Sequence, residues 1–251
     1  MSNPGVAQHV AGELRRQILA GRYHAGDRLP SREQLQYEFH VSPPSLREAF
    51  RILEGDGLVT VRRGKSGGSF VRSLSDGHAA RTLGMVLQSR KVGIGDIGQA
   101  LLELEPLCAA LCADRDDRAE VVVPHLVEAN RALRNSADRR EFSETSRSFH
   151  ELIAELCGNQ TFALFAGALE SLYSTHVAHW TEQVMAREAL PRDDFGSRCI
   201  DDHEALIELI ASGDREGAYR RLHAHNLESY DYMKGIEPTM LVDAELILPD
   251  G

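Results

Sequence analysis

The sequence predicts a mainly α-helical protein of two domains: a small N-terminal unit of three helices and a β-hairpin, followed by a larger all-α helical bundle. Two observations predict this division. Apolar residues recur at helical spacing along most of the chain, and only residues 58–72 carry short β-branched segments around a glycine-rich loop. With 251 residues, of which 42% are hydrophobic, the chain is long enough for two cores.

Charge is divided unevenly between these two parts. Residues 1–75 contain eleven Arg and Lys against seven Asp and Glu, which gives a net charge of +4. The remaining 17 basic and 31 acidic residues give the rest of the chain a net charge of −14. A basic head on an acidic body favours a nucleic-acid partner for the head, although the net charge of the whole chain is −10.

Composition also excludes several classes of protein. No uninterrupted apolar stretch approaches the ~20 residues of a membrane-spanning helix, and residues 1–22 lack the basic and apolar regions of a secretory signal. Cysteine occurs only at Cys108, Cys112, Cys157 and Cys199, which is too few and too scattered for a disulfide framework. We therefore expect reduced, buried thiols, a cytoplasmic location and no membrane partner.

The N-terminal elements follow from caps and turns. Apolar spacing predicts a first helix over 6–20, and Ser31 and Ser42 are typical N-caps for a second and a third helix. Prolines 43 and 44 fit the first turn of the third helix, where a missing amide donor costs little, and glycines 55 and 57 end it. Strands are predicted at 58–61 and 69–72. We assign residues 1–75 to a winged helix-turn-helix domain and residues 76–77 to a linker.

In such a domain the third helix enters the major groove of double-stranded DNA, and the cations of the hairpin contact the backbone. The predicted contacts are hydroxyls at helix starts, arginines on the helices, and the basic wing: Ser31, Arg32, Ser42, Ser45, Arg47, Arg51, Arg62, Arg63, Lys65 and Gly67. The alternative interpretation is that the basic hairpin is only a solvated loop.

The second part of the chain contains no convincing strand. Helices are predicted at 78–90, 96–115, 117–135, 138–157, 160–188, 197–212 and 214–234. We assign 78–236 to an all-α domain and 237–251 to a loose tail.

The residues of the N-terminal unit resemble the GntR family of bacterial regulators. The resemblance is carried by Leu29-Pro30-Ser31, Val41-Ser42, Leu46-Arg47-Glu48-Ala49, Leu53-Glu54 and Gly57-Leu58-Val59. Two positions depart from the family pattern. Arg32-Glu33 reverses the usual acidic-then-arginine pair, and Pro43 stands where the family usually has an arginine. The base preference of relatives therefore does not transfer directly.

The helical part resembles the effector domain, called FCD, of the FadR-like branch of that family. Leu104-Glu105-Pro106, Phe149-His150, Gly158-Asn159, His203 and His225 carry this resemblance. It implies a homodimeric transcription regulator that binds a short inverted-repeat operator and responds to a small organic effector such as a carboxylic acid. Because regulators of this family are more often repressors, we expect a repressor.

The resemblance also implies a divalent metal, Zn²⁺, Ni²⁺ or Fe²⁺, held by His150, His203 and His225. His223 and His225 lie about 200° apart around one helix, so only one of them can face a shared cavity. The carboxylate ligand usual in the family is replaced by Ser146. The site is therefore a three-histidine site, a site completed by another group, or a set of hydrogen-bonded histidines without metal.

The expected effector-binding residues combine these positions with their neighbours: Leu101, Glu105, Ser146, His150, Asn159, His176, His203 and His225. Leu101 stands where the family often has an arginine for an effector carboxylate, and His176 is alternatively half of a surface pair with His179. Two other functions compete with the regulator: a metal-dependent hydrolase with an accessory DNA-binding head, and an effector-independent DNA-binding protein. The hydrolase lacks a convincing general base beside the histidines, so we do not expect an enzyme.

Overall fold

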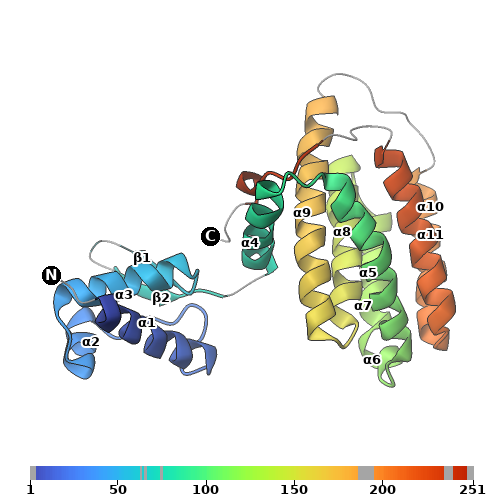
Figure 1. The fold of residues 1–251 in the computed structure, drawn as a ribbon. Helices are drawn as coiled ribbons and strands as arrows, with labels where there is room; N and C mark the ends of the chain where they lie inside the picture. Colours follow the sequence, from blue (N-terminus) through green and yellow to red (C-terminus); the bar gives the residue numbers. More distant parts are fainter. Residues whose placement is uncertain are drawn as a thin grey trace. The chain divides into compact units, whose positions relative to one another are not determined.

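The computed structural model describes residues 4–62, 64, 67–73, 76–185, 195–234 and 240–247. The chain divides into two compact units, Met1–Ser75 and Asp76–Gly251 (Figure 1). The first holds three helices and a hairpin, and the described residues of the second hold helices, so the predicted fold class is confirmed. No described helix is long and apolar enough to cross a membrane.

The N-terminal unit contains α1, α2, α3 and the strands β1 and β2, with these bounds: Pro4–Leu19, Arg32–Phe39, Pro43–Gly55, Val59–Arg62 and Gly68–Val71. The strands are antiparallel, and Val59 pairs with Val71 while Arg62 pairs with Gly68. Each strand differs from its predicted range by one residue. The core between the helices and the hairpin is aliphatic and aromatic, and includes Leu14, Leu35, Leu46, Phe50, Leu53 and Val71.

Local chemistry fixes the helix starts as predicted. The Ser31 hydroxyl accepts a hydrogen bond from the amide of Gln34, and the Gln34 side chain accepts one from the Ser31 amide, which forms a capping box. Ser42 caps α3, and Pro43 occupies its first turn. These caps satisfy amide groups that have no partner within the helix. The hairpin is held by Arg28, whose guanidinium donates to the carbonyl of Gly67 at 2.7 Å.

The helical unit runs from α4 to α11, followed by a short 3-10 helix, η1. Their bounds are Asp76–Ser89, Ile94–Asp114, Arg118–Val121, Val123–Arg134, Arg139–Leu156, Gln160–Met185, Phe195–Ser212, Arg215–Lys234 and, for η1, Ala244–Leu246. In Figure 1 the long helices lie side by side as a bundle, and α11 packs along α5. Gly158 (φ +79°) and Gly213 (φ +77°) take the left-handed conformation that ends α8 and α10.

The single helix predicted over 117–135 is wrong. The structure has two helices there, α6 and α7, which meet at Val122. Pro124 explains the break, because proline has no amide hydrogen to donate to a preceding turn and is accommodated in the first turn of a new helix. Val122 itself is fully buried in the bundle core.

The loose tail predicted over 237–251 is also wrong for residues 240–247. Gly93 forms an isolated bridge with Leu241, and the amide of Val242 donates to the carbonyl of Val92 at 3.0 Å. Val242 and Ile247 are buried in a second core cluster of the helical unit, together with residues of α4, α5 and α9. This segment therefore belongs to the folded unit.

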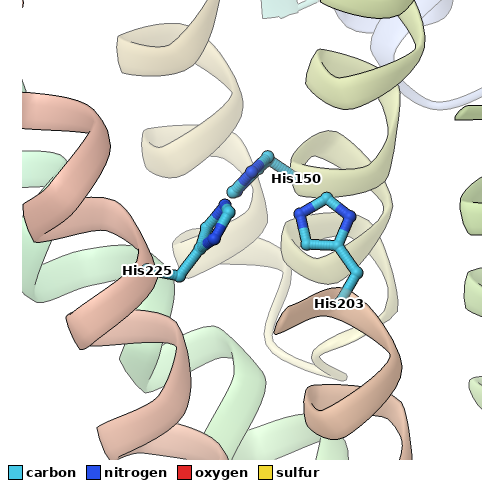
Figure 2. Close-up of side chains that lie close together, drawn as sticks. All are labelled: His150, His203 and His225. Atoms are coloured by element: carbon cyan, nitrogen blue, oxygen red, sulfur yellow. The ribbon is translucent and has the colours of Figure 1, made fainter. Parts of the chain in front are cut away.

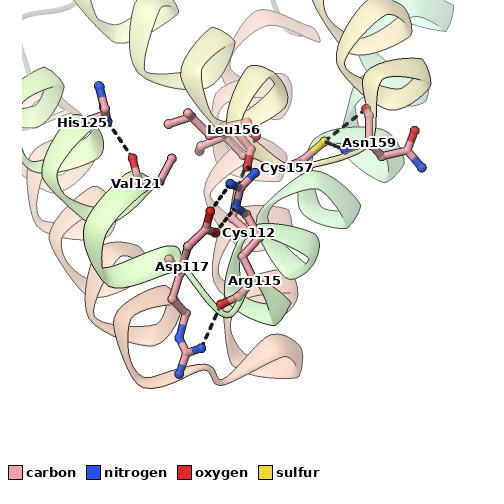
Figure 3. Close-up of polar contacts among 10 residues, drawn as sticks. Cys112, Arg115, Asp117, Val121, His125, Leu156, Cys157 and Asn159 are labelled. Atoms are coloured by element: carbon pink, nitrogen blue, oxygen red, sulfur yellow. Dashed lines mark hydrogen bonds and ion pairs between the residues drawn. The ribbon is translucent and has the colours of Figure 1, made fainter.

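Arg115 connects α5, α6 and α8 at one end of the bundle (Figure 3). It follows α5, pairs with Asp117 at 2.8 Å, and donates from Nη1 to the carbonyl of Leu156 at 3.1 Å, near the end of α8. Arg118 of α6 in turn donates to the carbonyl of Arg115 at 2.9 Å. The guanidinium thus satisfies a carbonyl at a helix end that has no partner within its own helix.

We expect Arg115→Ala to lower the free energy of unfolding of the helical unit by about 1–2 kcal/mol, because a charged hydrogen bond to Leu156 is lost. Urea unfolding followed by the fluorescence of Trp180, the single tryptophan, measures this change. Arg131→Ala is the control, since Arg131 pairs with Glu128 on an exposed surface and such pairs contribute little. Equal losses in the two variants would contradict the role given to Arg115.

Candidate DNA-binding face and histidine site

Helix α3 separates its buried and exposed residues cleanly. Leu46, Ala49, Phe50 and Leu53 are buried against the core of the N-terminal unit. At 100° per residue, the exposed positions Pro44, Arg47 and Arg51 share a side that is turned away from these buried residues, whereas the exposed Pro43 lies close in angle to Phe50. This exposed side is the candidate reading face, and it carries two arginines.

The predicted contacts differ in how they are placed. Arg47 and Arg51 are exposed, and Arg51 makes only an exposed pair with Glu48 at 3.3 Å. Arg32 is exposed at the start of α2. Arg62 lies on β1 with its guanidinium 5.0 Å from the centre of the Phe70 ring, which holds the side chain against the wing.

Ser45 does not fit the predicted role of a base contact. Its side chain is buried, and its hydroxyl lies 3.0 Å from that of Ser42, with which it shares the N-terminal cap of α3. Ser45 lies in the first turn of α3, as expected of a groove contact, but its side chain points into the core of the N-terminal unit. Ser31 and Ser42 are exposed caps, Gly67 accepts the Arg28 hydrogen bond, and Arg63 and Lys65 lie outside the described residues.

Two residues that the sequence interpretation missed position the wing. Arg28 holds Gly67, and the Glu54 carboxylate at the end of α3 accepts a hydrogen bond from the amide of Val61 at 3.1 Å. The first contact joins residues 39 positions apart and the second joins residues seven positions apart, and neither follows from caps or apolar spacing. They fix the hairpin relative to the reading face.

Inside the helical unit, His150, His203 and His225 converge from α8, α10 and α11 (Figure 2). One ligand atom from each lies within 4.8 Å of the others. His203 is fully buried and His225 nearly so. The His203 ring stacks on Phe149 with centroids 3.8 Å apart, and Figure 2 shows its Nε2 turned toward the other two rings.

Carboxylates orient two of the three rings through Nδ1. Glu105 Oε2 lies 3.0 Å from Nδ1 of His150, and Asp202 Oδ2 lies 3.1 Å from Nδ1 of His225. A neutral ring that donates from Nδ1 keeps its Nε2 lone pair for another partner. This carboxylate–histidine arrangement is the one that orients metal-binding imidazoles in proteins.

The electrostatics of the site keep His203 and His225 neutral. Burial, and then the neighbouring His150, lower the pKa of His225 to about 4, although Asp202 opposes the shift. Burial, followed by His150 and His225, holds the pKa of His203 well below its usual range. Burial raises the pKa of Glu105, but His150 and Asn226 outweigh it, so that its net pKa is lowered. Neutral imidazoles are the form that binds divalent metals.

The donor set fits a divalent metal. A tetrahedral zinc places two imidazole nitrogens about 3.3 Å apart, so modest side-chain rotations would bring the three rings to bonding distance. His203 differs from the other two because its buried Nδ1 has no hydrogen-bond partner. Its Nε2 lies 3.7 Å from Sγ of Cys199, and that Sγ lies 4.0 Å from the hydroxyl of Ser146.

The remaining predicted effector residues have other surroundings. Glu105 is buried, and its carboxylate orients His150. The same carboxylate accepts a hydrogen bond from the Asn226 side chain at 2.7 Å. Leu101 is buried in the second core cluster, with residues of α4 and α9. Asp202 and Asn226 were missed by the sequence interpretation, although Asp202 directly precedes His203 and its acidic side chain was a visible signal.

The predictions for Asn159 and His176 are not supported by their geometry. The Asn159 carboxamide accepts hydrogen bonds from the amides of Thr161 and Phe162, so it caps α9. His176 is buried rather than part of a surface pair, and its Nε2 accepts from the amide of Asp243 at 2.8 Å. His176 therefore holds the 240–247 segment and lies outside the histidine group.

Comparison with known proteins agrees with this geometry. Residues 6–71 match the family described as bacterial regulatory proteins, gntR family, and residues 96–228 match the FCD domain. The chain is 27% identical over 227 residues to the HTH-type transcriptional repressor NanR of Cronobacter sakazakii, across 88% of this chain and 82% of that protein. It is 26% identical to YcbG of Bacillus subtilis, an uncharacterized HTH-type transcriptional regulator, across 88% and 86%.

Among solved structures, a GntR protein of Streptococcus agalactiae resembles this chain with a TM-score of 0.70 and 21% identity, covering 90% of this chain and 99% of that one. A winged helix-turn-helix joined to a helical domain of this kind defines a class of DNA-binding transcription regulators. The chain belongs to the GntR family, in the FadR-like branch that carries an FCD domain.

In the helical unit without metal, we expect His225 alone to lower the free energy of unfolding by roughly 3 kcal/mol as the pH drops from 6.5 to 4, and His203 to add to this loss. The unfolded chain takes up a proton at His225 near pH 6.5, whereas the folded chain resists it until about pH 4. Urea unfolding in the presence of a chelator, repeated across this range, measures the slope.

His225→Gln should reduce this pH dependence by the part that comes from His225, while the buried His203 keeps the remainder. His223→Gln, two residues earlier on the same helix, should leave it intact. A stability that does not change between pH 6.5 and 4.5 in the unaltered protein would contradict the neutral, buried state of His203 and His225.

Proposed function

We propose that this protein is a homodimeric, ligand-responsive repressor that binds a short inverted-repeat operator. The observation that carries the DNA-binding part is the exposed face of α3, where Arg47 and Arg51 stand opposite the buried face of the same helix. Relatives at 26–27% identity named as transcriptional repressors support the direction of regulation. Because a bacterial transcription regulator binds chromosomal DNA, we also propose that this protein acts in the cytoplasm.

The proposed docking follows from the chemistry of the grooves. Helix α3 enters the major groove, where an arginine near its first turns donates to the acceptor pair of guanine. Arg62 and the wing contact phosphates, and the capped starts of α2 and α3 offer amides and hydroxyls to the backbone. Pro43 has no donor at the position where relatives often have an arginine, so the operator should differ from theirs in base preference.

The helical unit provides the proposed response to an effector. His150, His203 and His225 would hold a divalent ion, and Glu105 and Asp202 would keep the first and third of these rings oriented. When bound, such an ion supplies a positive charge that attracts an organic anion such as a carboxylate. Because Leu101 supplies no charge, the effector's anionic group would depend on this ion. Binding would shift the population of conformations and thereby the affinity for a two-fold operator.

Binding to DNA from upstream of the protein's own gene tests whether the exposed face of α3 contacts the operator. We expect Arg47→Ala to weaken binding by about 10- to 100-fold, because a bidentate base contact contributes 1–3 kcal/mol. Fluorescence anisotropy at two salt concentrations measures the affinity and its salt dependence.

Arg16→Ala is the matched control, since Arg16 is an exposed arginine on α1 that pairs with Glu13. It should change the affinity less than about threefold. Equal effects of the two substitutions, or binding without site preference, would contradict the assignment of α3. Light scattering of the free protein and of its DNA complex tests the proposed dimer independently.

Two histidines of α11, one inside the histidine group and one outside it, test the proposed metal binding. We expect the purified protein to bind about one Zn²⁺ per chain and His225→Ala to reduce the affinity by at least about tenfold, because a ligand is removed. His223→Ala is the control, since His223 is partly exposed and lies near Glu103 rather than in the group. Equilibrium dialysis with metal analysis gives both numbers, and equal zinc binding in the two variants would exclude this site.

A further inference from the structure

We propose that Cys199 is a metal ligand of the histidine group, so that the helical unit binds a divalent ion through three imidazoles and one thiolate. This inference rests on the proposal that the three histidines hold a metal. It assigns the fourth donor, which the resemblance to the family leaves open because Ser146 replaces the usual carboxylate. It also narrows the metal to ions that accept sulfur ligands, such as Zn²⁺ and Co²⁺.

The position of Cys199 relative to His203 carries the inference. Both residues lie on α10, four positions apart, so their side chains emerge on the same side of the helix. The thiol Sγ is 3.7 Å from Nε2 of His203, and a thiolate and an imidazole that share a tetrahedral zinc are about 3.6 Å apart. Figure 2 shows that this Nε2 is the nitrogen turned toward His150 and His225.

Ser146 of α8 stands where the family usually supplies a carboxylate ligand, so α8 provides no strong fourth donor to the ion. Its hydroxyl lies 4.0 Å from the Cys199 sulfur, so the thiol lies beside the residue that replaces the carboxylate. A neutral hydroxyl is a poor metal ligand, whereas a thiolate is among the best for zinc. Cys199 is buried, with 3% of the residue exposed, which keeps competing water away from the thiol. Its Sγ is not among the atoms that lie within 4.8 Å of one another, so binding the ion requires a side-chain rotation that brings the sulfur closer to the three imidazoles.

The coordination step balances without an oxidant. The thiol S–H bond breaks as the sulfur binds the ion, the proton passes to solvent, and the sulfur electron pair forms the bond to the metal. The other thiols have different partners. Cys112 donates to the carbonyl of Ile153, and Cys157 contacts the backbone of Asn159. Cys157 is therefore a suitable control position.

Cobalt binding tests the proposal, because a thiolate bound to Co²⁺ gives a charge-transfer absorption in the near ultraviolet that imidazole and carboxylate ligands do not give. The purified full-length protein, stripped with a chelator, is titrated with Co²⁺ while dialysis measures the amount bound. We expect the band to grow to about one equivalent in the unaltered protein and in Cys157→Ser. In Cys199→Ser it should be absent, with an affinity weaker by at least about tenfold.

A second variant keeps the test informative if Cys199→Ser is unstable. The double substitution Ser146→Asp with Cys199→Ser restores a carboxylate ligand, and it should bind Co²⁺ more tightly than the single variant while lacking the band. Bound cobalt without a band in the unaltered protein, or a band that persists without Cys199, would overturn the thiolate ligand alone. No bound cobalt in any variant would overturn the metal site itself, and the DNA-binding measurements with Arg47→Ala would still stand by themselves.

Discussion

One buried carboxylate, that of Glu105, constrains how three helices pack in the interior of the helical unit. It lies on α5, faces Nδ1 of His150 on α8 and accepts a hydrogen bond from Asn226 on α11. A charge in such a place is tolerated only while its partners remain, and removing one partner of a buried pair costs about 3–5 kcal/mol. The three helices are therefore held in the register that brings these groups together, and the orientation of His150 follows from it.

The same requirement accounts for the contrast between the two units. The N-terminal unit has an apolar core, and its charges lie outside, where arginines on α3 are free to approach an anionic partner. The helical unit buries histidines and a carboxylate among its aliphatic residues. Polar groups buried at the junction of four helices restrict the packing to arrangements that satisfy them. An ion or ligand bound at this site would contact α8, α10 and α11 together and could therefore alter the packing of all three helices.

The sequence predicted the parts that depend on local chemistry. Ser31 and Ser42 cap helices because their hydroxyls reach amides two or three residues away, and such contacts are readable from order alone. The convergence of His150, His203 and His225 followed from the family resemblance rather than from spacing. The direction of a side chain needs the helical angle as well as the position along the helix, as Ser45 shows: it lies early in α3, but at 100° per residue it is only about 40° from the buried Ala49 and therefore faces inward.

Contacts between distant segments were the parts that the sequence did not reveal. His176 has the chemistry of a ligand-binding residue, but it binds the amide of Asp243, 67 positions away. Asn159 is a different case, because it caps α9 through the nearby amides of Thr161 and Phe162, a local contact that the sequence interpretation passed over. Likewise Pro124 was visible, yet only the packing of Val122 into the core shows where the helix divides. Partners chosen across the bundle depend on the whole three-dimensional arrangement, and one-dimensional patterns do not contain them.

The packing of residues 240–247 has a practical meaning for how the helical unit is isolated. The family match ends at residue 228, so a truncation drawn from it would remove the segment that covers Ala80 and Leu172. The guanidinium of Arg81 would also lose the carbonyl of Ile247, which it contacts at 2.9 Å. A shortened protein of this kind would expose apolar surface on α4 and α9 and tend to self-associate. Its oligomeric state would then reflect the cut rather than the native assembly.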